Sequence, residues 1–366
     1  MSLSLPFPVE SSPGHALHLN GVDVKGPAIS TNRIAYALAP SSRDFYRSQF
    51  GSATFEASSD HWIDFWGRDQ EYWEERLLEI NPTVLVTSWG TATLPTSLAR
   101  PDSALRYVCH LAGSVKRMVP RAFLEKGVLV SNWGTQINHA VAEHAMLLLL
   151  STLRNIGGWD SALKSWGNHV SPFSSIPLGT KSLRGSRVGL HGFGGIAREL
   201  TRMLQGFGVE VSSYSQGVPT AFYEQHGVRP CESLEELFST CDILMECEAL
   251  TPQTAGSVTE GILRLLPPDA VFINIARAPI VNEEALLKVV AEGRLRVGLD
   301  VFHDEPLSPK SPLVGAPHAV LSPHIAGPTS EMYPQLADFA IRNIREFLRG
   351  GKIEGLVNLE TYDRAT

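Results

Sequence analysis

The sequence has few of the features that would place the protein in a membrane, outside the cell or on a metal ion. Its four cysteines are never spaced as Cys-x-x-Cys, and no histidines lie near them in a zinc-ligand pattern, so we expect reduced thiols and no metal site. The first ten residues lack a basic segment and contain Pro6 and Pro8, which makes them a poor signal peptide. The longest apolar run, residues 145–150, is too short to span a bilayer. We therefore expect a cytoplasmic protein with no membrane partner.

Clustered positive charge is also missing. The chain has 31 Lys and Arg against 38 Asp and Glu, which gives a formal net charge of −7, and no basic run occurs. Binding to nucleic acid requires clustered Lys and Arg that neutralise phosphates, so nucleic acid is excluded as the main partner. Hydrophobic residues make up 43% of the chain and charged residues 19%, which is ordinary for a folded globular protein. A length of 366 residues indicates about two domains.

A glycine-rich turn between an apolar segment and an amphipathic one is the most informative motif. Residues 188–190 form a short apolar run typical of a buried strand, and apolar side chains recur at helical spacing from Ile196 onwards. Between them, Gly192, Gly194 and Ala197 follow the pattern Gly-x-Gly-x-x-Ala. In dinucleotide-binding domains such glycines permit a tight turn and a close approach to a pyrophosphate, which the next helix N-terminus holds. Alone, the pattern is equally typical of a structural turn, but its strand-turn-helix setting favours a cofactor site.

Strand and helix patterns alternate along most of the chain. We interpret residues 1–31 as an irregular arm and predict a long helix over residues 61–80. Strands are predicted at residues 33–38, 83–87, 106–111, 128–130, 188–190, 209–214, 242–245, 270–275, 297–301 and 319–321. Other helices are predicted at residues 119–126, 138–154, 234–238, 283–292 and 334–348. The alternation predicts an α/β fold: a small parallel domain followed by a doubly wound parallel sheet.

Three polar side chains follow successive predicted strands of the second domain: Arg277, Glu305 and His324. Ligands of doubly wound sheets bind at the carboxyl ends of the strands, so we expect these side chains to converge there. Each alone has an ordinary interpretation, as a solvated arginine, a loop carboxylate or a structural histidine. Together they suit the reduction of a 2-oxo acid: the guanidinium binds the substrate carboxylate, the imidazole protonates the carbonyl oxygen, and the carboxylate orients the imidazole. A nicotinamide would carry the hydride.

The chain resembles the D-isomer-specific 2-hydroxyacid dehydrogenases over residues 33–358, most closely over residues 183–327. The matching stretches are LRGSRVGLHGFGGI (183–196), LTPQT (250–254), NIAR (274–277), GLDVFHDEP (298–306) and SPHIAG (322–327). The resemblance implies a Rossmann-type cofactor domain over residues 136–324 and a smaller flavodoxin-like α/β substrate domain. That substrate domain would be discontinuous, residues 32–135 and 325–366, because the last helix returns to it. Members of the family are commonly homodimers.

The resemblance also implies roles for individual residues. His324 would be the acid/base, Glu305 would support it, and Arg277 would bind the carboxylate and carbonyl of the substrate. The residues implied to contact NAD or NADP are Gly192, Gly194, Gly195, Ile196, Ser215, Ala276 and Asp300, the last beside the nicotinamide amide. The residues implied to bind the substrate through a loop of the first domain are Ala112, Gly113 and Ser114, by their backbone amides.

The chain departs from the family pattern where the cofactor ribose is selected. An acidic residue is expected about 20 residues beyond the glycines to hold the ribose 2′-hydroxyl, but Ser215 stands there, followed by Gln216 and Gly217. Without a carboxylate nothing repels a 2′-phosphate, and without an arginine nothing attracts it, so we expect both NAD and NADP to be accepted. Elsewhere, Trp89 and Trp133 either shape an apolar pocket for a larger substrate or, as we prefer, pack in the core or at an interface.

The sequence thus favours an NAD(P)-dependent oxidoreductase that interconverts a 2-oxo acid and a D-2-hydroxy acid. The alternative is an NAD(P)-sensing regulatory protein on the same fold, but a sensor has no need to keep Arg277, Glu305 and His324 together. A third interpretation, the family's branch that acts on formate or phosphite, fits the pairing of Glu305 with His324 less well. The expected partners are a small 2-oxo or 2-hydroxy acid and a second copy of the chain.

Overall fold

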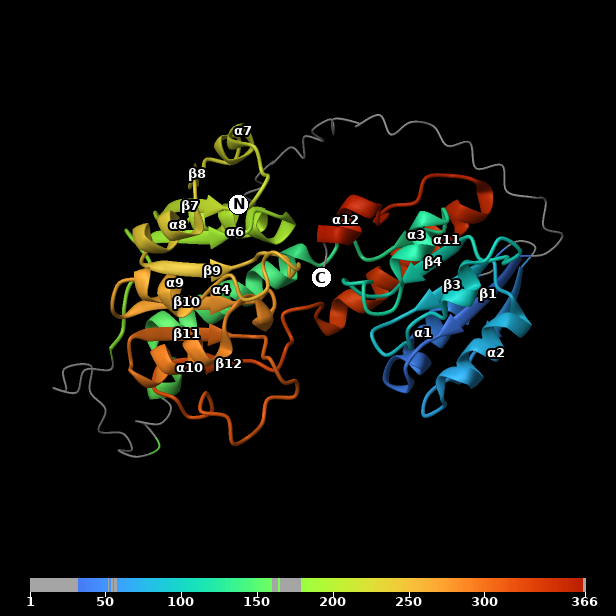
Figure 1. Ribbon diagram of the computed structural model, residues 1–366, viewed down its shortest axis with the longest axis horizontal. Coiled ribbons are helices and arrows are strands. Elements are labelled where there is room, and N and C mark those ends of the chain that lie inside the picture. Colours follow the sequence, from blue (N-terminus) through green and yellow to red (C-terminus); the bar gives the residue numbers. More distant parts are fainter. Residues whose placement is uncertain are drawn as a thin grey trace, which may run out of the picture.

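The computed structural model describes residues 32–364, except 52, 54, 56–57, 160–163 and 165–178, and these residues form two lobes (Figure 1). Each lobe is built on a parallel sheet that has an apolar cluster on each of its two faces, so the predicted α/β class is confirmed. The arm expected over residues 1–31 lies outside the described residues. None of the described helices combines the length and apolar character needed to cross a bilayer.

The first sheet has the strand order β2-β1-β3-β4-β5, which is the flavodoxin-like order. Its strands are β1 (Asn32–Ala37), β2 (Ser58–Trp62), β3 (Val84–Thr87), β4 (Tyr107–His110) and β5 (Leu129–Ser131). Its helices are α1 (Pro40–Gly51), α2 (Gln70–Ile80), η1 (Thr96–Ala99), α3 (Arg121–Glu125), η4 (Ser330–Met332), α11 (Tyr333–Arg349) and α12 (Leu359–Arg364). Along β1, Ile34 and Tyr36 join one apolar cluster while Ala35 and Ala37 join the other. Both faces are therefore covered, as parallel sheets require.

The second sheet has the order β12-β11-β10-β9-β6-β7-β8. Its strands are β6 (Arg187–His191), β7 (Glu210–Tyr214), β8 (Arg229–Pro230), β9 (Ile243–Glu246), β10 (Ala270–Asn274), β11 (Leu295–Leu299) and β12 (Ala319–Leu321). Its helices are α4 (Asn138–Arg154), α6 (Gly195–Gln205), α7 (Thr220–Glu224), α8 (Leu234–Thr240), α9 (Glu260–Leu265), η3 (Ala278–Ile280) and α10 (Glu283–Ala291). The strand order reverses between β6 and β9, which is the switch point of a Rossmann-type sheet.

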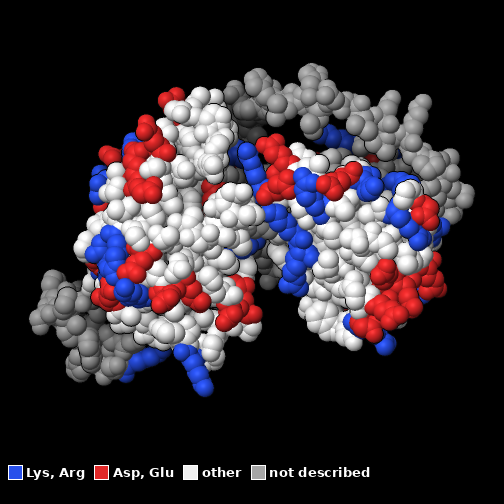
Figure 2. Space-filling model, viewed as in Figure 1, with Lys and Arg blue, Asp and Glu red and all other residues white. Residues whose placement is uncertain are grey.

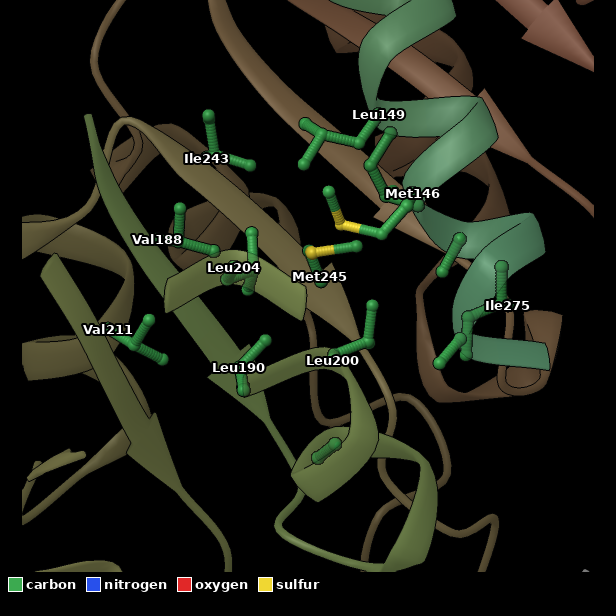
Figure 3. Packing of buried hydrophobic residues seen from close by; sticks show 14 of the residues in the cluster. Met146, Leu149, Val188, Leu190, Leu200, Leu204, Val211, Ile243, Met245 and Ile275 are labelled. Atoms are coloured by element: carbon green, nitrogen blue, oxygen red, sulfur yellow. The ribbon is translucent and has the colours of Figure 1, made fainter. Parts of the chain in front are cut away.

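Helix α4 explains the longest apolar run of the sequence. Met146 and Leu149 of α4 point toward Met245 of β9 and toward Leu200 and Leu204 of α6, so the helix is buried against the second sheet (Figure 3). Leu200 and Leu204 are four residues apart and therefore lie on the same face of α6. Most of the apolar run thus faces the core within a 17-residue helix, while Leu147 is 56% exposed.

Both segments that connect the lobes leave from the carboxyl ends of strands. β5 ends at Ser131, and the chain then leads to α4, which begins at Asn138. The side chain of Asn138 lies against Gly195 of the glycine turn, where it would collide with an added Cβ atom. In the other direction, β12 ends at Leu321 and the chain crosses back to α11. The carboxyl edges of both sheets therefore face the cleft that opens between the two lobes (Figure 2).

The helix predicted over residues 61–80 is wrong in its first half, and helix α1 was not predicted. α2 begins only after Asp69, whose carboxylate accepts a hydrogen bond from the backbone N–H of Tyr72 (2.9 Å). Trp62 instead ends the edge strand β2 and stacks on Tyr36 of β1, with ring centroids 4.4 Å apart. The tryptophan spacing resembles a helical period, but strand pairing and ring stacking decide the conformation here.

Helix α11 returns the chain to the first lobe. Its buried side chains include Leu336, Phe339, Ala340 and Ile344, and the last two pack in the cluster that covers one face of the first sheet. The helix ends at Gly350, which adopts a left-handed conformation (φ 72°), a common helix stop. The first lobe therefore depends on residues from both ends of the described chain (Figure 1).

This dependence predicts the effect of truncating Ile344. Ile344 has no exposed surface, so Ile344→Ala should lower the free energy of unfolding by about 3 kcal/mol, through lost burial and the cavity left behind. Gln335→Ala, at an exposed position of the same helix, is the matched control and should change it by less than about 0.5 kcal/mol. The measurement is equilibrium denaturation by urea. Equal effects of the two variants would contradict this packing.

Candidate active site

The glycine turn has the geometry of a phosphate-binding site. Gly192, directly after β6, has φ +94°, and a Cβ atom on it would lie 2.6 Å from the backbone nitrogen of Glu248, so only glycine fits. Gly194 precedes α6 with no side-chain cap, and a Cβ atom on it would meet nothing within 4 Å. The first turn of α6, which includes Gly195 and Ile196, therefore begins with no side-chain cap on its backbone N–H groups. These residues fit a dinucleotide pyrophosphate.

His324 and Glu305 form a hydrogen-bonded pair beyond the carboxyl ends of β12 and β11. Nδ1 of His324 lies 2.7 Å from Oε2 of Glu305, and Oε1 of Glu305 accepts a hydrogen bond from the backbone N–H of Phe302 (3.1 Å). An ionised carboxylate only accepts, so Nδ1 carries a proton and Nε2 is left for a substrate. The two side chains are 41% and 37% exposed, so a ligand can reach them.

Asp300 holds the backbone that carries His324. Its carboxylate is buried after β11 and accepts hydrogen bonds from the backbone N–H groups of the two residues that follow His324 (both 2.9 Å) and from the Ser322 hydroxyl (2.6 Å). His144 of α4 also lies 3.3 Å from it. Burial by itself raises the pKa of Asp300, but the hydrogen bonds from His144, Ser322 and the backbone outweigh it and lower the pKa. Asp300, expected beside the nicotinamide, therefore also fixes the position of His324.

Arg277 leaves β10 with its guanidinium free of strong partners. The side chain is half-buried and donates to the carbonyl oxygen of Ala276 (2.7 Å), and within the described part of the chain no carboxylate forms an ion pair with it. Burial lowers its pKa, while the nearby charge of Glu305 raises it. A guanidinium that is partly desolvated and lacks an ion-pair partner is suited to binding an incoming carboxylate.

The predicted substrate loop lies on the first sheet, directly after β4. Within it, Ala112 is fully buried, its carbonyl oxygen accepts a hydrogen bond from the backbone N–H of Trp133 (3.1 Å), and the side-chain amide of Asn132 donates to the carbonyl oxygen of Gly113. Gly113 and Ser114 are partly exposed. The loop is therefore braced by the segment that leads from β5 toward α4.

The two tryptophans near this loop have different roles. Trp133 is 3% exposed and packs with Ala112 and Leu336, so it belongs to the core, as we preferred. Trp89 is 48% exposed and lies edge-on to His110, with ring centroids 6.2 Å apart. Because Trp89 follows β3 at the carboxyl edge of the first sheet, it remains a candidate wall of the cleft.

Comparison with known proteins identifies the family. Residues 146–326 match the family model described as D-isomer specific 2-hydroxyacid dehydrogenase, NAD binding domain. A glyoxylate/hydroxypyruvate reductase of Arabidopsis thaliana is 32% identical over 240 residues, which cover 64% of this chain and 71% of that reductase. The chain belongs to the D-isomer specific 2-hydroxyacid dehydrogenase family. Its activity is therefore that of a 2-hydroxyacid or 2-oxo acid oxidoreductase, and its cofactor is NAD or NADP.

A second relative and a solved structure are also similar to this chain. A glyoxylate reductase of Pyrococcus furiosus is 29% identical over 304 residues, which cover 81% of this chain and 89% of the reductase. The apo structure of a D-mandelate dehydrogenase of Rhodotorula graminis has a TM-score of 0.77 at 22% identity and covers 90% of this chain and 98% of its own. This likeness shows that our chain and the D-mandelate dehydrogenase share the two-lobed fold.

In the present structure a carboxylate lies beside Ser215, although the sequence analysis found no acidic residue at this position. Ser215, directly after β7, donates its hydroxyl to Oε2 of Glu248 at 2.6 Å, and its backbone N–H donates to the hydroxyl of Tyr223 (2.9 Å). The expectation that this position lacks a carboxylate was thus incomplete. Glu248 follows β9, 33 residues further along the chain, so only the pairing of strands reveals that the two residues meet.

A second pair of a histidine and a carboxylate lies at the ends of β6 and β9, next to the glycine turn. Nδ1 of His191 is 2.7 Å from Oε2 of Glu246, and the two side chains are 4% and 0% exposed. Burial lowers the pKa of His191, but the charge and hydrogen bond of Glu246 and the charge of Glu248 outweigh it, so the pKa is raised. Sequence reasoning did not single out either residue, because a histidine next to a glycine and a glutamate in a strand carry no motif.

The raised pKa predicts how stability depends on pH. The contribution of protonated His191 is complete below the usual histidine pKa of about 6.5 and is lost as the pH rises through the raised pKa. His191→Gln should therefore lower the free energy of unfolding by about 3 kcal/mol at pH 6, because Glu246 is left buried without its partner, and by less at pH 9. Denaturation by urea at the two pH values measures the difference.

His226→Gln is the matched control. Nδ1 of His226 donates to the backbone carbonyl oxygen of Phe222 (2.8 Å) instead of a carboxylate. Its replacement leaves no buried carboxylate without a partner, so it should cost less than His191→Gln at pH 6. An effect of His191→Gln that does not change between pH 6 and pH 9 would show that folding does not raise the pKa of His191.

Proposed function

We propose that the protein is an NAD(P)-dependent dehydrogenase that interconverts a 2-oxo acid and a D-2-hydroxy acid. The observation that carries the proposal is the His324–Glu305 pair, which lies partly exposed beside Arg277 at the same strand ends that adjoin the glycine turn. An acid/base, a support for it and a free guanidinium are the groups that this reaction requires. The sensing role that we considered as an alternative explains none of these side chains.

The chain's own residues divide the reaction as follows. Arg277 binds the substrate carboxylate and orients the carbonyl, and the backbone amides of Gly113 and Ser114 close on the substrate from the first lobe. His324, whose Nδ1 donates to Glu305, gives a proton from Nε2 to the carbonyl oxygen during reduction and takes it from the hydroxyl during oxidation. Glu305 fixes the orientation of the imidazole through this hydrogen bond. A bound nicotinamide supplies the hydride to the carbonyl carbon or accepts it from the hydroxy acid.

The same proposal assigns the cofactor site and the domains. The residues proposed to contact the cofactor are Gly192, Gly194, Gly195, Ile196, Ser215, Ala276 and Asp300. The cofactor domain comprises residues 136–324, and the substrate domain comprises residues 32–135 and 325–366. We also propose that the enzyme is a homodimer, because that assembly is common in the family, and sedimentation tests it.

Reduction of a panel of 2-oxo acids tests the proposed function. The relatives named glyoxylate reductase and glyoxylate/hydroxypyruvate reductase make glyoxylate and hydroxypyruvate the first substrates to try, and exposed Trp89 adds aromatic 2-oxo acids. We expect at least one acid to be reduced, with loss of NADH or NADPH absorbance and formation of the D-hydroxy acid. Cofactor binding without turnover on any acid would support a sensor instead.

The proposed role of His324 predicts a loss of turnover with retained cofactor binding. His324→Ala should lower kcat about 10²–10⁴-fold, because it removes the proposed acid/base. The affinity for NADH, measured by calorimetry, should be unchanged. The matched control is His303→Ala, since that imidazole lies on the segment after β11 but hydrogen-bonds to the carbonyl oxygen of Val281 (3.0 Å). Unchanged kcat in the His324 variant would remove its assignment as the acid/base.

A further inference from the structure

Glu248 brings a carboxylate to the place where the cofactor ribose is selected. Its Oε2 atom lies 2.6 Å from the hydroxyl oxygen of Ser215, the first residue after β7. In dinucleotide-binding domains an acidic residue at this strand end accepts a hydrogen bond from the ribose 2′-hydroxyl. Here a serine stands at the strand end and holds a carboxylate that arrives from the segment after β9.

Two hydrogen bonds, one to each oxygen, orient the carboxylate of Glu248. Oε1 of Glu248 accepts from the backbone N–H of Ala249 (2.9 Å), and the backbone N–H of Glu248 donates to Oε1 of Glu246 (2.9 Å). The Glu248 backbone also lies against Gly192, where a Cβ atom would be 2.6 Å from its nitrogen. Each carboxylate oxygen accepts one of these bonds, which leaves lone pairs for the hydroxyl of a ligand.

Glu248 accepts from a hydroxyl and a backbone N–H, and within the described part of the chain it forms no ion pair. Glu246 is paired with His191, so their charges offset each other. Arg364 of α12 approaches from the first lobe: a Cβ atom on Gly217 would lie 3.7 Å from Nη2 of this residue. Arg364 is 65% exposed and pairs at 3.6 Å with a carboxylate on its own helix. Solvent and that partner screen its charge, so it opposes the fixed carboxylate only weakly.

We propose that Glu248, held by Ser215, makes this enzyme select NAD over NADP. The proposal rests on the proposed function, because it requires the glycine turn to bind the adenosine half of the cofactor. Glu248 accepts a hydrogen bond from the ribose 2′-hydroxyl and repels a 2′-phosphate. Glu248, from the segment after β9, takes the place of the acidic residue that is missing after β7. The sequence analysis expected both cofactors to be accepted, whereas this proposal expects a preference for NAD.

A purely structural role for Glu248 would give a different result. If the carboxylate only fixed the loop after β9, its replacement would weaken the binding of phosphorylated and unphosphorylated ribose alike. Only a residue at the ribose changes the ratio of the two affinities. The ratio, and not either affinity alone, therefore decides the question.

The experiment is calorimetric titration of the full chain with NADH and NADPH, and with 5′-AMP and adenosine 2′,5′-bisphosphate, which lack the nicotinamide. The wild-type chain should bind NADH at least about tenfold more tightly than NADPH, as expected for a carboxylate close to a phosphate in a partly exposed site. In Glu248→Gln the NADPH affinity should rise about tenfold, since the repulsion is removed, and the NADH affinity should fall slightly. The adenosine compounds should show the same change in ratio.

Three variants separate charge from structure. Glu248→Asp keeps the negative charge and should keep the preference for NADH. Ser215→Ala removes the hydrogen bond that orients the carboxylate and should reduce the preference without abolishing it. Glu224→Gln neutralises an exposed glutamate on nearby α7 and should leave the ratio unchanged. Thermal unfolding of each variant confirms that it is folded.

A wild-type chain that binds NADPH as tightly as NADH, or a ratio that Glu248→Gln does not change, would overturn this proposal and leave the proposed function intact. Failure of the wild-type chain to bind either cofactor would overturn both.

Discussion

Parallel strand pairing is the constraint on which the site depends. β6, β9, β10, β11 and β12 run in the same direction through the second sheet, so their carboxyl ends meet at one edge. The glycine turn, Arg277, Glu305 and His324 all follow these ends, although up to 132 residues separate Gly192 from His324 in the sequence. Both connections between the lobes leave from the same edges, and this turns the two halves of the site toward one cleft (Figure 2).

Carboxylates position the other groups at this edge. Asp300 accepts hydrogen bonds from the backbone after His324, and Glu305 accepts from its imidazole. Glu246 and Glu248 do the same beneath and beside the glycine turn, where they hold His191 and Ser215. Each carboxylate is fixed by two or more donors, so it is oriented before any ligand arrives. Such preorganisation lowers the cost of ordering the site on binding.

The two histidine–glutamate pairs differ in burial, and this difference separates a structural role from a catalytic one. His191 and Glu246 are almost fully buried at 2.7 Å, so the imidazole cannot exchange protons with a ligand and the pair supports the turn. His324 and Glu305 have the same distance but are about two-fifths exposed, so Nε2 is accessible. The same side-chain chemistry therefore stabilises the fold in one place and suits acid/base work in the other.

The sequence alone determined the elements whose signals are local. The change of period across Gly192 and Gly194 predicted a strand, a turn and a helix, and the apolar stripe of α11 predicted a helix with one buried face, because neighbouring residues set both patterns. The helix predicted over residues 61–80 failed where β2 pairs with β1, since strand pairing is not local. Only the tertiary structure brought Glu248 to Ser215, because the residues directly after β7 are not acidic. The strands β7 and β9 lie on either side of β6, and their carboxyl ends reach the same edge of the sheet.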